Sequence, residues 1–145
     1  PIFVTVGGQQ LDHAGSRAIA RRFPCDRTSQ PSLIILLLAP GAGEVLWLCT
    51  RDTFLPSTTD GLARTAARSL WIPCQVVHES ALLPFWPLAD RGPVVALMGS
   101  DPWAYPGAAT DPKALHHAAQ LATEIALRWV KVEHQSVIVS LGSAT

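Results

Sequence analysis

Short apolar runs alternate with longer amphipathic stretches along this chain, and Gly or Pro separates most of them. The runs at residues 2–6, 44–50, 74–78, 93–98 and 136–141 predict strands, and the stretches at 11–23, 57–71 and 111–130 predict helices. Such alternation favours an α/β fold, here a mostly parallel sheet with helices on both faces in a Rossmann-like three-layer sandwich. With 145 residues, we expect one domain over residues 1–145.

Two segments carry clear boundary signals, and one remains ambiguous. Asp111 followed by Pro112 is typical of a helix start, with an N-cap and then a proline at the first helical position. Pro73 predicts the end of the preceding helix. The apolar run at 33–38 fits either a short helix or a buried strand, because periodicity cannot separate the two over so few residues.

Charged residues make up only 15% of the chain, against about 25% in typical proteins, while hydrophobic residues make up 48%. We expect so apolar a chain to hide surface either in a second copy or in a missing neighbouring domain. A second copy would make the protein a homodimer, which is the partner that we predict. The net charge is zero and no basic cluster exists, which disfavours binding to duplex nucleic acid.

The cysteines and the apolar runs indicate a cytoplasmic protein. Cys25, Cys49 and Cys74 are odd in number and widely spaced, which favours a reducing compartment over a disulfide framework. No basic leader precedes an apolar run at the start, and the longest apolar run, 33–39, is far shorter than the roughly 20 residues of a membrane helix. We therefore expect no membrane partner.

Small and hydroxyl-bearing residues follow four of the predicted strands. In an open α/β sheet, ligands bind beyond the carboxyl ends of the strands, where Gly, Ser and Thr let an anion approach backbone N–H groups. We therefore expect these four turns to converge on one rim and to flank one pocket. Arg51 either clamps a phosphate or pairs with a carboxylate such as that of Asp52. His13, directly after the first turn, either contacts the ligand or caps a helix. The predicted ligand-binding residues are Gly7, Gly8, Gln9, His13, Thr50, Arg51, Thr53, Ser100, Asp101, Gly142 and Ser143.

No motif for a nicotinamide cofactor, a P-loop or a serine nucleophile is present. Gly7 and Gly8 do not complete G-x-G-x-x-G because position 12 is Asp12, and neither G-x-x-x-x-G-K-[ST] nor G-x-S-x-G occurs. The five histidines form no H-x-x-x-H pair, so we expect no metal site. We also expect no cofactor, and the catalytic residues stay unassigned.

The opening I-F-V-T-V-G-G-Q and the stretch P-G-A-G-E-V-L-W-L-C-T-R-D-T resemble the first two strands and ligand loops of CRISPR-associated Rossmann fold (CARF) domains. The ending S-V-I-V-S-L-G-S-A-T falls where such domains often carry a strand running into T-G-G-T-K; here Ser143 replaces the second Gly and no Lys follows. The resemblance implies a dimeric sensor of cyclic oligoadenylate, a nucleotide second messenger of antiviral defence. Ring nuclease activity is a variant of this role.

The chain also resembles the tautomerase superfamily, both in its start P-I-F-V-T-V, with Pro1 first, and in residues 115–141. It implies a Pro1-dependent tautomerase or dehalogenase, in which the secondary amine acts as a base. The helix at 57–71 and the strand after it have no counterpart in that fold. A third reading, an interaction module of a larger assembly, rests on the apolar composition.

Overall fold

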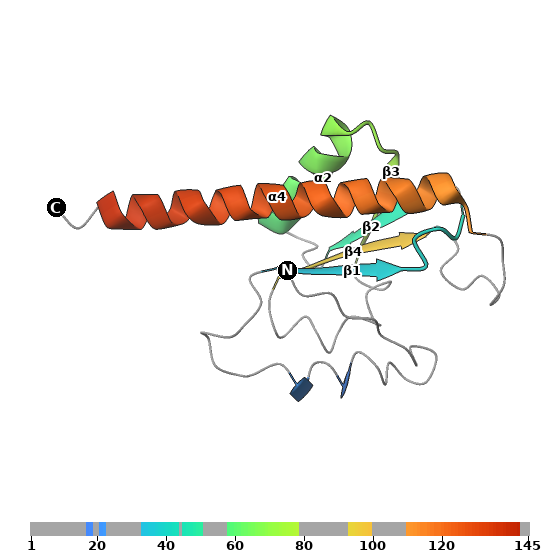
Figure 1. Cartoon of the computed structure of the whole chain (residues 1–145), viewed down its shortest axis with the longest axis horizontal. Helices are drawn as coiled ribbons and strands as arrows, with labels where there is room; N and C mark the ends of the chain where they lie inside the picture. The colour runs from blue at the N-terminus through green and yellow to red at the C-terminus, as the bar shows by residue number, and fades with distance from the viewer. Residues whose placement is uncertain are drawn as a thin grey trace.

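The computed structural model describes residues 17–18, 21–22, 33–43, 45–50, 58–78, 93–99 and 110–142. Its elements are β1 (Ile34–Leu38), β2 (Leu46–Thr50), α2 (Thr58–Ser69), β3 (Cys74–His78), β4 (Val94–Gly99) and α4 (Pro112–Gly142) (Figure 1). The α/β class is therefore confirmed, and the ambiguous run at 33–38 forms a strand.

The four strands form a mixed sheet in the order β1-β4-β2-β3. β1 runs parallel to β4 and β2 runs parallel to β3, but the central pair, β4 and β2, is antiparallel. The described strands therefore do not form the expected mostly parallel sheet. They form two parallel pairs, and one pair runs in the opposite direction to the other. The cause is the short link between β1 and β2: parallel strands need a crossover of a dozen or more residues, whereas residues 39–45 alone join these two.

This link crosses the carboxyl end of β4, which lies between β1 and β2. Ala42 N–H donates a hydrogen bond to the Ala39 carbonyl (2.8 Å), and Asp111 N–H donates to the Gly41 carbonyl (2.9 Å). A Cβ added at Gly99 would collide with the carbonyl oxygens of Ala39 and Ala42. We call this region, residues 39–42 with Gly99 and Asp111, the closed corner.

One face of the sheet carries the main core. Leu48 and Leu97, both fully buried, meet small side chains of α2 such as Ala63 and Ala66, which let the helix approach closely. α4 adds Ala118, Leu121 and Ile125 to the same cluster. In the described residues, then, both helices cover the same face; the other face buries Ala96 and Met98.

α4 begins where the sequence predicts a helix start, but it continues beyond the predicted end at residue 130. The Asp111 carboxylate accepts a hydrogen bond from Lys113 N–H (2.9 Å), which confirms the N-cap. The helix then runs for 31 residues, through the strand predicted at 136–141, and its C-terminal part extends past the sheet (Figure 1). That prediction is wrong because no Gly or Pro between Val130 and Ser136 stops the helix. No helix in the described residues is long and apolar enough to cross a membrane.

Candidate functional site

The strand ends predicted to form one rim do not all meet. Thr50, the last residue of β2, pairs with Val95 near the start of β4, whereas Gly99 at the end of β4 pairs with Leu46. The carboxyl ends of β2 and β4 therefore lie at opposite edges of the sheet, because the two strands are antiparallel. This corrects the expectation that both flank one pocket.

Gly142 also has a different setting from the one predicted. It is the last residue of α4 and not part of a loop after a strand. The other predicted residues lie outside the described ranges, as does Pro1: Gly7, Gly8, Gln9, His13, Arg51, Thr53, Ser100, Asp101 and Ser143.

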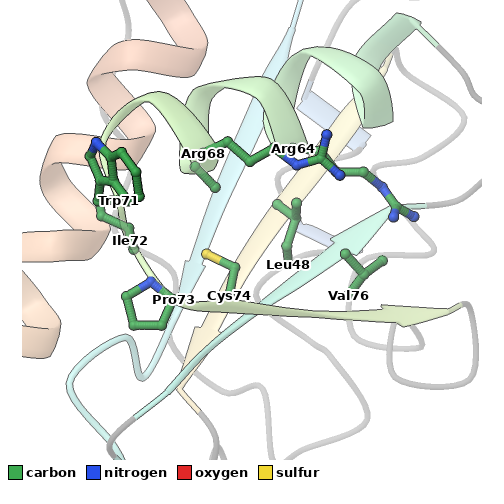
Figure 2. Close-up of a pocket in the computed structure, with 9 residues that line it drawn as sticks. Leu48, Arg64, Arg68, Trp71, Ile72, Pro73, Cys74 and Val76 are labelled. Atoms are coloured by element: carbon green, nitrogen blue, oxygen red, sulfur yellow. The ribbon is translucent and has the colours of Figure 1, made fainter.

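A cavity of about 580 Å³ lies between the C-terminal half of α2 and strands β2 and β3 (Figure 2). Its volume falls in the range of about 300–1,000 Å³ that is typical of small-molecule sites. Its apolar floor is formed by the partly buried Cys74 and Val76, while Leu48 and Ile72 also line it but are themselves buried. The full lining is Leu48, Arg64, Ala67, Arg68, Trp71, Ile72, Pro73, Cys74 and Val76.

The residues at the C-terminal end of α2 form the rim of this cavity. Trp71 N–H donates to the Arg68 carbonyl and Ile72 N–H donates to the Ala67 carbonyl, both at 3.1 Å, which is the Schellman pattern. The pattern needs a left-handed residue just past the helix, and Trp71 takes that position with φ of 56°. The chain then turns at Pro73 into β3, so that Trp71 stays 91% exposed at the rim.

Arg64 is held in place by a buried carboxylate one helical turn earlier. Its Nε lies 3.0 Å and 2.9 Å from the two carboxylate oxygens of Asp60, a side chain that is only 9% exposed. Asp60 stands in the first turn of α2, where a negative charge also favours the helix dipole. The pair fixes the aliphatic stem of Arg64 against the cavity and offsets one positive charge.

Arg68 supplies the remaining positive charge. Within the described part of the chain, no carboxylate lies within ion-pair distance of its guanidinium, and the residue is exposed. Figure 2 shows both arginine side chains extending toward the same end of the cavity, above Leu48 and Val76, with Trp71 at the other end. Two guanidinium groups against one carboxylate leave a net charge of about +1 at an apolar floor, a setting that attracts an anion.

Cys74 lies at the start of β3 and lines the same cavity. Burial raises the pKa of its thiol to about 11, so the side chain is a neutral thiol at physiological pH. A thiol that keeps its proton is a poor nucleophile. Cys74 therefore serves as an apolar wall, and no group of metal-ligating side chains occurs among the described residues.

No family model, curated protein or solved structure matches this chain. Sequence reasoning missed Arg64, Arg68 and Trp71 as site residues. It placed the two arginines on the polar side of the helix predicted at 57–71, and Trp71 at the end of that helix. The one available signal was a bulky Trp directly before the Ile72-Pro73 break, at a position where Gly is the usual residue.

Proposed function

We propose that this chain is a ligand-binding domain whose ligand is an anionic nucleotide, held in the cavity between α2 and β3. One observation carries the proposal: a cavity of about 580 Å³ that combines a net positive charge from Arg64 and Arg68 with an apolar floor. In this proposal the guanidinium groups bind the phosphate, and the apolar floor contacts the uncharged base and sugar. Neither a duplex nucleic acid nor a purely apolar ligand suits both features.

The nucleotide class is the one that the CARF resemblance names, a cyclic oligoadenylate second messenger. A cavity of this size holds one nucleotide unit well, so two copies of the chain would each take part of one ring. In this proposal the domain acts as a cytoplasmic homodimer with a Rossmann-like three-layer architecture. Sensing needs only that the bound and free states differ, so the role requires no catalytic group.

Calorimetric titration with AMP and with cyclic tri-, tetra- and hexaadenylate tests the proposal. We expect saturable binding of at least one of them, weakened about tenfold or more in the Arg68→Gln variant, because a charge-assisted hydrogen bond is worth about 1.5–3 kcal/mol. Arg21→Gln is the matched control: Arg21 is exposed and does not line the cavity. Absence of binding to all four ligands would reject the proposal, as would equal losses in the two variants.

A further inference from the structure

We infer that Trp71 is a stacking surface for a planar aromatic ring, so that the cavity selects ligands that carry a base over base-free phosphates. This inference rests on the proposed function and names the group that the uncharged end of the cavity recognises. Three observations on Trp71 support it: its exposure, its backbone conformation and its place relative to the two arginines.

The exposure of Trp71 is exceptional within the described residues. The residue is 91% exposed, whereas Trp47 is partly buried and packs against Ala96 and Met98 on the other face of the sheet. A fully exposed indole leaves a large apolar surface in water, and a stacked ring would remove one of its faces from water. Stacking of a base on an aromatic side chain increases binding affinity about fivefold to a hundredfold.

The backbone of Trp71 is in a conformation that disfavours a bulky residue. With φ of 56° it occupies the left-handed position after α2, where Gly meets no steric cost. The hydrogen bonds at Trp71 N–H and Ile72 N–H would form equally well with Gly at this position. The indole therefore contributes nothing that the helix end requires. Ala39 in the closed corner also has a positive φ, of 39°, so the exposed ring, and not the backbone conformation alone, marks Trp71 as a ligand contact.

The position of Trp71 suits a ligand with one aromatic and one anionic end. Figure 2 shows the indole at one end of the cavity and the two guanidinium groups at the other. Arg64 lies five positions before Ser69, the last residue of α2, so a rise of about 1.5 Å per residue puts its backbone roughly 7–8 Å along the axis from the helix end that Trp71 follows. A nucleotide lying along the cavity would place its base against Trp71 and its phosphate at Arg64 and Arg68.

Calorimetric titrations of AMP and ribose 5-phosphate into the wild type and three variants test this inference. Trp71→Gly and Trp71→Asn remove the ring and keep a residue that tolerates the left-handed backbone, and Trp71→Phe retains a smaller ring. We expect AMP to bind the wild type at least fivefold more tightly than ribose 5-phosphate. The Gly and Asn variants should lose this preference, and the Phe variant should keep part of it.

The outcomes separate the inference from the proposed function. Equal binding of AMP to the wild type and to Trp71→Gly would overturn the stacking role and leave nucleotide binding in place. Binding of both ligands with no preference for AMP would do the same. If neither ligand nor any cyclic oligoadenylate binds the wild type, the proposed function itself fails. Concentration-dependent burial of Trp71 without ligand, seen as a blue-shifted emission absent from Trp71→Gly, would reassign the indole to a protein contact and overturn the inference.

Discussion

The two corners of the sheet differ in what fills them. At the closed corner, backbone lies against backbone, and Gly99 fits only because it has no side chain. At the corner between α2 and β3, which we call the open corner (the residues that line the cavity), side chains line a cavity of about 580 Å³ that is open to solvent. The glycine-rich corner is a structural crossing, and the corner without glycine has room for a ligand.

This contrast shows why glycine misleads as a signal for ligand sites. Gly permits close approach of the backbone to a ligand, but it permits close approach of another strand or link equally well. At Gly99 the approaching group is the link between β1 and β2. At the open corner the informative residue is Trp71, which occupies a position where Gly would be less strained.

The largest expected effect is that of Gly99→Ala. The new methyl group would collide with the carbonyl oxygens of Ala39 and Ala42, which belong to a hydrogen-bonded turn and cannot yield as a flexible side chain would. We expect a loss of about 3 kcal/mol in the free energy of unfolding, measured by urea denaturation.

Gly61→Ala is the matched control for that substitution. Gly61 lies inside α2, and nothing stands within 4 Å of an added Cβ. Alanine there should stabilise the protein by about 0.5–1 kcal/mol. Equal changes in the free energy of unfolding for the two substitutions would contradict the close backbone contacts at Gly99.

A smaller loss is expected for Asp111→Ala, also at the closed corner. The substitution removes the carboxylate that caps Lys113 N–H and leaves the Asp111 N–H bond to Gly41 in place. We expect about 1 kcal/mol of destabilisation by the same denaturation assay. Asp111→Asn should retain most of the stability, since asparagine caps equally well, and an equal loss in both variants would contradict the capping role.

At the open corner, Trp71→Gly should change stability in the opposite direction. Gly removes the steric cost of the left-handed conformation, and the gain is reduced because Gly also has more freedom in the unfolded chain. We expect a net gain of about 0.5–1 kcal/mol in thermal or urea unfolding. A loss of stability would mean that the indole supports the fold and is not held at the rim for a ligand.

At neutral pH the smallest expected effect is that of the Cys74 thiol, whose contribution appears only under alkaline conditions. This thiol has a pKa of about 11 in the folded protein against 9.0 for a free thiol, because burial disfavours the thiolate. Between these pH values the unfolded chain loses the proton and the folded chain keeps it, so the free energy of unfolding falls as the pH rises above about 9. The difference in this pH dependence between the wild type and Cys74→Ala measures the effect. Identical slopes would show that the thiol is not shielded.

Local signals in the sequence predicted much of the fold. The strands near 44–50, 74–78 and 93–98, the helix before Pro73 and the helix start at Asp111 are all confirmed. Each has a marker within a few residues: an apolar run, a proline or an N-cap. The strand predicted at 136–141 failed because β-branched residues also continue a helix that is already formed, provided that no breaker intervenes.

The direction of the strands and the site depend on contacts that no local pattern records. The link at 39–45 is too short for a parallel crossover, which could have predicted that β1 and β2 run in opposite directions. The insertion of β4 between them could not have been foreseen from that link. Likewise, Arg64 and Arg68 appear in the sequence as a solvated helix face, and only the packing of α2 over β2 and β3 places them above an apolar floor.

An NMR titration with cyclic tetraadenylate, following backbone amide and indole N–H signals, tests most directly which corner binds the ligand. We predict saturable shifts for residues 64–76, including the Trp71 indole, and none for residues 39–42 and Gly99. Shifts confined to the closed corner, with residues 64–76 unmoved at saturation, would contradict it.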